Sequence, residues 1–487
     1  MFDENEISKE IRKIFYITGP CGSGKTSELF KIIKSNSDLK FMIVQGTKAL
    51  IEQSKQTLLS EHSITATAIY SSGEEGENVM NRITNFLQEP TSRVLIITDK
   101  AFWNLSTSLL GDYKIYLDDV VSFSVFKVIN ENELNMKNLV KSQVFNELKD
   151  VAGSIDSKGT ATYVTATKKE QEGELHKSIQ KQFSVTEQND KFFMNKSWFT
   201  QMDTEQLTIL AYKDLTKYLG LDITFMANDF ENTLIYHAYS ELFEKVELNL
   251  RTRTVPVQDR LVVKYFSKGN LSATWKKNNP EKLKRVYDYL NNELKGRSFY
   301  WTNNKKDGDQ FSLLGEFISP DSRGLNEFQD HDTCIWLASM KPNPSEAACL
   351  EHAFDITGAQ IVQARELEGL HQFVMRGCIR KFDSSDIQTV YVFSEEQAKY
   401  LVSNPQYIDL RLDDDEPKKP GAPVKSVTIP KHIIKRKSTF IRVCKNADIE
   451  VSIPVFKQWV AEKCNDCSNE VQESMIDKFM KDLAKAK

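Results

Sequence analysis

A glycine-rich stretch near the start of the chain carries the residue types that bind phosphate. It reads Gly19, Pro20, Cys21, Gly22, Ser23, Gly24, Lys25, Thr26 and fits the P-loop pattern, which ends in Gly-Lys-Ser/Thr. The glycines let backbone N–H groups converge on phosphate oxygens, which a Cβ would obstruct. Lys25 can reach the β- and γ-phosphates, and the Thr26 hydroxyl can bind Mg²⁺. Because a β-rich run precedes the loop and a helical pattern follows it, we predict that these residues bind ATP and Mg²⁺.

Two adjacent carboxylates end an apolar run later in the chain. Residues 114–117 read Lys-Ile-Tyr-Leu and are followed by Asp118 and Asp119. A parallel sheet places its strand ends along one edge, so we expect Asp118 to lie beside the P-loop and to hold Mg²⁺ through water. Asp119 would then orient or deprotonate the attacking water. The alternative is an ordinary Asp-Asp turn after a strand, since Asp is common in turns.

The elements that must position these residues alternate between strands and helices. The strands predicted in the first part of the chain are 13–18, 40–44, 65–69, 94–98, 114–117 and 161–164. Alternation with helical stretches favours a parallel sheet covered on both faces. The same rhythm returns at 260–266, 297–302, 316–319, 333–338 and 389–393. The predicted fold class is therefore α/β, with two parallel-sheet lobes.

The chain divides into five predicted segments. They are lobe 1 (1–168), a helical insertion or connector (169–255), lobe 2 (256–410), a linker (411–437) and a small C-terminal helical domain (438–487). The insertion is assigned because the alternation stops there and 204–220 and 228–243 have a helical character. The linker is assigned from its successive acidic, proline-containing and basic stretches.

Composition and charge limit the class of protein. The 487 residues are 40% hydrophobic and 27% charged, which is typical of a globular protein of two or three domains. A formal net charge of −4 excludes a uniformly basic nucleic-acid binder, so any such contact must use local patches. The acidic N-terminus differs from a secretory signal, no apolar run could span a bilayer, and the seven cysteines are scattered. We expect a cytoplasmic protein without a membrane partner.

The order of segments over roughly residues 13–399 resembles the superfamily 2 helicases. The lobe 1 segments that resemble motifs I, Ia, Ib, II and III of that family are the P-loop, 44–53, Thr98-Asp99, Asp118-Asp119 and Thr165-Ala166-Thr167. The lobe 2 segments that resemble motifs IV, V and VI are 299–302, 322–326 and 371–380. The resemblance implies two RecA-like lobes with ATP between them and nucleic acid across their top. It implies a nucleic-acid-dependent ATPase acting as a helicase or translocase.

The same resemblance implies roles for individual side chains. Gln372 would sense the γ-phosphate, and Arg376 and Arg380 would be arginine fingers. A helix would place these three side chains on one face at i, i+4 and i+8. A guanidinium aimed across a lobe interface stabilises charge in the transition state and is withdrawn when the lobes separate. Contacts to nucleic acid, with single-stranded DNA favoured over RNA, are assigned to Thr47, Thr98, Thr302 and Arg323.

Two departures from the family pattern leave other functions open. Most relatives have Asp-Glu in motif II. The side chain of Asp119 is one methylene shorter than Glu, so its carboxylate would lie roughly 1.5 Å farther from the attacking water and could slow hydrolysis. The second arginine of motif VI usually lies three residues after the first, whereas Arg380 lies four after Arg376. One alternative is a non-motor P-loop enzyme such as a small-molecule kinase. Another is a weakly hydrolysing helicase-like scaffold, and the C-terminal domain is a candidate site for a protein partner.

Overall fold

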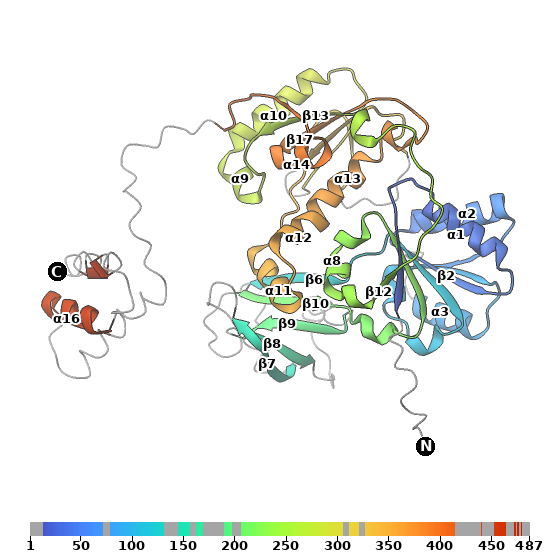
Figure 1. Cartoon of the computed structure of the whole chain (residues 1–487), viewed down its shortest axis with the longest axis horizontal. Coiled ribbons are helices and arrows are strands. Elements are labelled where there is room, and N and C mark those ends of the chain that lie inside the picture. Colours follow the sequence, from blue (N-terminus) through green and yellow to red (C-terminus); the bar gives the residue numbers. More distant parts are fainter. Residues whose placement is uncertain are drawn as a thin grey trace. The chain divides into compact units, whose positions relative to one another are not determined.

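The computed structural model describes residues 13–71, 78–130, 145–155, 162–168, 189–196, 206–304, 311–320, 327–413, 440, 452–463, 472–473, 475–476 and 479. The chain forms two compact units, 1–413 and 414–487. The first unit contains three β-sheets, which define lobe 1, an inserted sheet and lobe 2 (Figure 1).

Sheet A is the seven-stranded parallel sheet of lobe 1. Its strands lie in the order β12 (Phe243–Lys245), β1 (Ile14–Thr18), β11 (Asp222–Ala227), β5 (Tyr113–Asp118), β2 (Lys40–Gln45), β4 (Val94–Thr98) and β3 (Thr67–Ile69). The central strands β2 and β4 are almost entirely buried. Continuous apolar strands of this kind form where helices cover both faces of a parallel sheet.

Helices pack on both faces of sheet A. They are α1 (Lys25–Ser35) and α2 (Lys48–His62) on one face, and α3 (Val79–Gln88) and α4 (Asp99–Phe102) on the other. Successive residues of β2 alternate between the two cores, because side chains of a strand point to opposite faces. Ile43, for example, belongs to the core that contains Leu29 of α1, while its neighbour Val44 belongs to the core that contains Phe86 of α3. The loops that lead into α1, α2 and α4 therefore meet at the carboxyl edge of the sheet.

Sheet B is a five-stranded antiparallel sheet inserted in the sequence between β5 and β11. Its order is β6 (Ser124–Asn130), β10 (Gln206–Tyr212), β9 (Lys191–Asn195), β8 (Thr162–Lys168) and β7 (Phe145–Ile155). The segment Thr165-Ala166-Thr167 lies in β8 of this sheet and pairs antiparallel with β7 and β9. Its assignment to a strand end of the lobe 1 parallel sheet is therefore wrong.

The helical insertion predicted for 169–255 also differs from the structure. Among its described residues, β9 and β10 belong to sheet B, and β11 and β12 return to sheet A. The helical elements described between β10 and β12 are short, and include α8 (Leu234–Tyr239). The physical reason is burial on the sheet: Leu207, Ile209 and Leu210 are fully buried in β10, where the helical periodicity expected for 204–220 does not apply. Lobe 1 therefore continues well beyond residue 168.

Sheet C is the six-stranded parallel sheet of lobe 2. Its order is β15 (Glu316–Phe317), β14 (Tyr300–Asn303), β16 (Thr333–Leu337), β17 (Gln388–Ser394), β13 (Leu261–Ser267) and β18 (Gln406–Tyr407). Helix α10 (Pro280–Glu293) covers one face, and α13 (Glu368–Val374) and α14 (Glu395–Leu401) cover the other. Leu412 is buried in this lobe, so lobe 2 extends into the segment predicted as a linker. The predicted fold class of two parallel-sheet α/β lobes is confirmed.

A run of helices in lobe 2 connects the two lobes. It comprises α11 (Pro344–Phe354), α12 (Gly358–Val362), a π-helical turn (Gln363–Leu367) and α13. Leu350 and Ile361 belong to the hydrophobic core of lobe 1, whereas Leu370 and Phe373 belong to that of lobe 2. Figure 1 shows α11 beside sheet B and α13 beside lobe 2. The π-turn thus lies between a segment anchored in one lobe and a segment anchored in the other.

The second unit is helical in its described part. Helix α16 (Ile453–Lys463) contributes Phe456 and Val460 to a small core with Phe440, Met475 and Phe479. Among the described residues of the whole chain, no helix is both long and apolar enough to cross a membrane.

Candidate functional site

The P-loop connects β1 to α1 at the carboxyl edge of sheet A. Gly22 and Gly24 have φ angles of 80° and 90°, in the left-handed region that glycine adopts without strain. The Lys25 ammonium donates hydrogen bonds to the carbonyls of Gly19 (2.5 Å) and Pro20 (3.2 Å). The hydroxyl of Ser23 is buried without a hydrogen-bond partner among the described residues. The unsatisfied hydroxyl of Ser23 and the ammonium of Lys25 both belong to this loop, and together they suit a phosphate ligand.

Asp118 ends β5 and faces the first turn of α1. Its Oδ2 accepts hydrogen bonds from the Thr26 hydroxyl (3.0 Å) and from the amide of Gln45 (3.0 Å), which ends the neighbouring strand β2. Gln45 also donates to Ser54 on α2 (2.9 Å). Burial raises the pKa of Asp118, and the hydrogen bonds from Gln45 and Thr26 oppose that rise. A hydroxyl and a carboxylate at this separation form an oxygen donor set suited to Mg²⁺.

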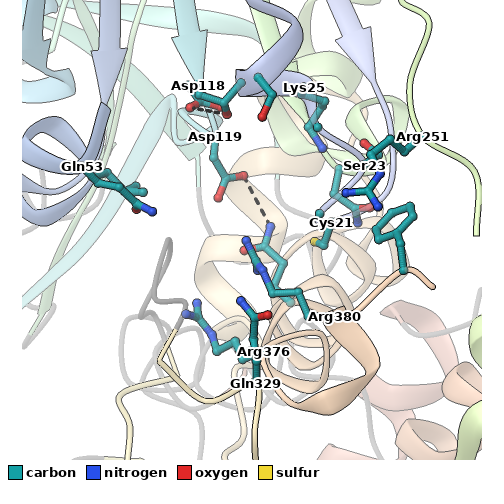
Figure 2. Close-up of a pocket in the computed structure, with 18 of the residues that line it drawn as sticks. Cys21, Ser23, Lys25, Gln53, Asp118, Asp119, Arg251, Gln329, Arg376 and Arg380 are labelled. Atoms are coloured by element: carbon teal, nitrogen blue, oxygen red, sulfur yellow. Dashed lines mark hydrogen bonds between the residues drawn. The ribbon is translucent and has the colours of Figure 1, made fainter. Parts of the chain in front are cut away.

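Asp119 lies directly beyond the strand in an unusual backbone conformation. Its φ is 58°, a left-handed conformation that Asp tolerates better than most residues, and its N–H donates to the carbonyl of Met226 (2.8 Å). The turn directs its carboxylate into the space between the lobes, where Oδ1 lies 3.5 Å from Nε2 of Gln372 in lobe 2 (Figure 2). The two acidic residues therefore face different partners.

Lobe 2 presents two arginines to the same space. Helix α13 ends at Val374, so Arg376 and Arg380 do not continue the helical face of Gln372 as the sequence predicts. The helix stops before Gly377, whose backbone approaches Gln388 so closely that a Cβ would lie 2.3 Å from its Oε1. Burial lowers the pKa of Arg376 to about 10 and also lowers the pKa of Arg380. Both remain cations at neutral pH.

One pocket collects most of the predicted site residues. Its volume is about 730 Å³. The predicted residues that line it are Cys21, Gly22, Ser23, Gly24, Lys25, Thr26, Asp118, Asp119, Gln372, Arg376 and Arg380. Figure 2 shows Lys25 and Asp118 on one side and Arg376 and Arg380 on the other, with Asp119 between them. Gly19 and Pro20 contribute indirectly, as acceptors for Lys25.

A partly buried polar contact joins the lobes at this pocket, which Asn228 also lines. Asn228 follows β11, the strand between β1 and β5, and its amide Nδ2 lies 2.9 Å from both carboxylate oxygens of Glu368 in α13. Glu368 also accepts a hydrogen bond from Gln372, at 2.8 Å. Sequence reasoning missed both Asn228 and Glu368. The available signal was positional, since Asn228 comes directly after an apolar strand and Glu368 lies one helical turn before Gln372.

The segment that joins β12 to β13 contacts the P-loop. Arg253 stacks on the ring of Phe382, 3.9 Å from its centroid, and donates to the carbonyls of Cys21 (3.3 Å) and Ile379 (2.6 Å). A Cβ on Gly22 would lie 3.1 Å from the same ring. Lobe 2 therefore contacts the P-loop directly, which the sequence does not reveal.

A second arginine of this region supports the segment that carries Arg380. The Arg260 side chain is fully buried at the start of β13. Its guanidinium donates to backbone carbonyls of four residues: Cys378 (3.2 Å), Ile379 (3.3 Å), Lys381 (2.8 Å) and Asp386 (3.0 Å). The segment 378–386 thus takes its shape around one buried cation.

Three of the residues predicted to contact nucleic acid, Thr47, Thr98 and Thr302, do not line the pocket. Thr47 and Thr98 cap α2 and α4, accepting hydrogen bonds from the backbone N–H of Leu50 (3.3 Å) and Ala101 (3.2 Å). Thr302 is fully buried in β14, so its side chain is not accessible to nucleic acid. Arg323 lies outside the described residues.

Comparison with known proteins adds one sequence match and several distant structural ones. Residues 240–402, about a third of the chain, match the family described as YonV C-terminal Rossmann-like domain. No curated protein matches the chain in sequence.

Three solved structures illustrate the distant similarity. Xpd4 from S. tokodaii is 11% identical and has a TM-score of 0.44, with 81% of this chain and 96% of that chain covered. S. cerevisiae Dbp5 bound to RNA and ADP BeF3 is 10% identical with a TM-score of 0.37, covering 82% and 85%. The Arterivirus nonstructural protein 10 helicase with DNA is 12% identical with a TM-score of 0.32, covering 80% and 63%. At these scores the likeness carries no inference about activity.

Proposed function

We propose that this protein is a nucleic-acid-dependent ATPase that acts as a helicase or translocase of the superfamily 2 type. The observation that supports it most directly is the shared pocket. A P-loop lysine and an acidic pair from one α/β lobe line a pocket of about 730 Å³, and two arginines from the second lobe line its opposite wall. A catalytic site completed by a second lobe is the arrangement in which ATP binding can drive lobe closure and hydrolysis can release it.

Each side chain has a chemical task in this proposal. Lys25 and the backbone N–H groups of the P-loop hold the β- and γ-phosphates, and Ser23 gains a partner for its buried hydroxyl. Thr26 and Asp118 hold Mg²⁺, which neutralises phosphate charge when it is bound. Asp119 orients the attacking water.

The lobe 2 side chains stabilise the transition state. Arg376 and Arg380 supply positive charge to the transferring phosphoryl group from the opposite wall of the pocket. Gln372, which is 3.5 Å from Asp119, senses whether a γ-phosphate is present. Nucleic acid is expected to run across the top of both lobes, with single-stranded DNA favoured over RNA.

The test measures phosphate release from ATP without nucleic acid, with single-stranded DNA and with single-stranded RNA. The proposal expects stimulation by nucleic acid and loss of turnover in Lys25→Ala. Turnover that is indifferent to nucleic acid but consumes a small acceptor would replace the motor with a kinase.

A scaffold that binds ATP but hydrolyses little is the second candidate. It is favoured by Asp119, whose shorter side chain stands where the helicase pattern has Glu. Nucleotide binding without release of phosphate under any of the three conditions would support it.

A further inference from the structure

The two lobes meet at the site through a matched set of acids and amides. At the carboxyl edge of sheet A, Asp119 follows β5 and Asn228 follows the adjacent strand β11. On α13, Glu368 and Gln372 lie four residues apart, so they share one face of the helix. Asn228 pairs with Glu368 and Asp119 with Gln372, so that each acid on one lobe faces an amide on the other.

The four side chains form one continuous chain of hydrogen bonds. The Asn228 amide donates to Glu368 (2.9 Å), Gln372 donates to Glu368 (2.8 Å), and Gln372 also reaches Asp119 (3.5 Å). A primary amide has two N–H donors, so Gln372 can serve both acids at once. Glu368 is buried, with an exposed fraction of 6%, and carboxylates at such positions depend on their donors.

This geometry fixes the register of the lobes. A slip of α13 by one turn against sheet A would place Glu368 opposite Asp119 in one direction, or Gln372 opposite Asn228 in the other. Two facing carboxylates in a partly buried interface are strongly unfavourable, since each needs donors that the other cannot supply. Arg376 follows Gln372 on the same segment, so its place relative to Lys25 depends on this register.

We propose that Asn228 and Glu368 are positioning residues that hold lobe 2 in the hydrolysis-competent register, with Gln372 directed at Asp119. The inference rests on the proposed ATPase function and deepens it. The pair acts through Gln372, Arg376 and Arg380, which line the same pocket as Asn228.

The experiment is a reciprocal exchange of acid and amide. Asn228→Asp alone places two carboxylates face to face, and Glu368→Gln alone replaces the carboxylate that both amides share with an amide, which keeps one acceptor oxygen and loses the charge. The double variant N228D/E368Q restores an acid opposite an amide with the roles reversed, and the net charge of the site stays that of the parent. Measurements are kcat, KM for ATP, and the Kd of a fluorescent ATP analogue, each with thermal unfolding to show that the variants fold.

The expected result is a fall in kcat by about 10- to 100-fold in Asn228→Asp and a smaller fall in Glu368→Gln. The Kd of the analogue should stay within about threefold in both, because the P-loop is intact. The double variant should recover to within about threefold of the parent kcat, since residues in direct contact are coupled.

A matched control lies two residues earlier in the same run of helices. Glu366 is also buried, but it pairs within lobe 2, with the backbone N–H of Met340 (2.9 Å) and with Gln397 (2.9 Å). Glu366→Gln should leave kcat within about threefold. If the exchange variant is no more active than Asn228→Asp, or if Glu366→Gln mimics Glu368→Gln, the inference is overturned. If the parent shows no turnover that Lys25→Ala removes, the proposed ATPase function itself fails, which is a separate outcome.

Discussion

Substitution of Arg260 by methionine tests whether one buried cation shapes the catalytic wall of lobe 2. The change keeps an unbranched apolar stem and removes every donor of the guanidinium. The carbonyls of Cys378, Ile379, Lys381 and Asp386 lose those donors together, and Arg380 lies within that segment. We therefore expect a less stable lobe 2 and a displaced Arg380.

The size of the effect follows from these contacts. A hydrogen bond from a charged donor contributes roughly 1.5–3 kcal/mol, but bonds that share one side chain do not add in full. A total of about 3–5 kcal/mol is reasonable for a fully buried group. At about 2–4 °C per kcal/mol for a domain of this size, the melting temperature of lobe 2 should fall by on the order of 10 °C.

The assay combines thermal unfolding followed by circular dichroism with ATP turnover at a temperature where the variant is folded. Arg260→Met should lower kcat by about 10- to 100-fold, because a small misplacement of a catalytic group has effects of that size. Arg285→Met is the control, since Arg285 is exposed on α10 and its hydrogen bond to the described part of the chain is a 3.4 Å contact with the carbonyl of Leu410. A variant at 260 that melts within about 2 °C of the parent and turns over at its rate would refute the argument.

Three further predictions concern the pocket. Lys25→Ala should abolish phosphate release and leave the melting temperature almost unchanged, because the hydrogen bonds of Lys25 within the described residues go to carbonyls of its own loop. A folded variant with normal turnover would contradict this. Arg376→Ala should lower kcat by on the order of 10³ while the Kd for ATP changes little, and an equal loss of both would argue against a finger. Burial raises the pKa of Asp118 and the Gln45 amide opposes it, so Gln45→Leu should raise that pKa further. Because Asp118 must be ionised to hold Mg²⁺, the acid limb of kcat/KM should move to higher pH, and a limb that stays in place would count against the role of Gln45.

The parts of the site that the sequence predicts are those that depend on short stretches of chain. The P-loop needs a strand, a turn with left-handed glycines and a helix, and all three lie within about twenty residues. Asp118 could be placed beside it because strand ends of a parallel sheet share one edge, and the 3.0 Å contact to Thr26 agrees with that placement.

The parts that the sequence does not predict depend on contacts between distant segments. Asn228 becomes part of the site only because β11 returns to sheet A next to β5, after the whole of sheet B has intervened. In the sequence, Arg260 is an arginine that precedes a strand and carries no further signal. Its role depends on the segment 378–386, which folds around its side chain. Apart from 161–164, which overlaps β8, the strands of sheet B are not predicted from the sequence, since pairing with other strands rather than local periodicity decides their structure.

The connection between the lobes constrains how this site can work. Ile361 is anchored in the core of lobe 1 and Phe373 in that of lobe 2, and the π-turn Gln363–Leu367 lies between them. Glu368 and Gln372 follow that turn directly, so their place relative to Asn228 and Asp119 is determined by both cores at once. A π-turn interrupts regular helical packing and is a common place for a helix to bend. A change in the angle between the lobes would therefore act directly on the amide and acid pairs, and also on the contact between Phe382 and the P-loop.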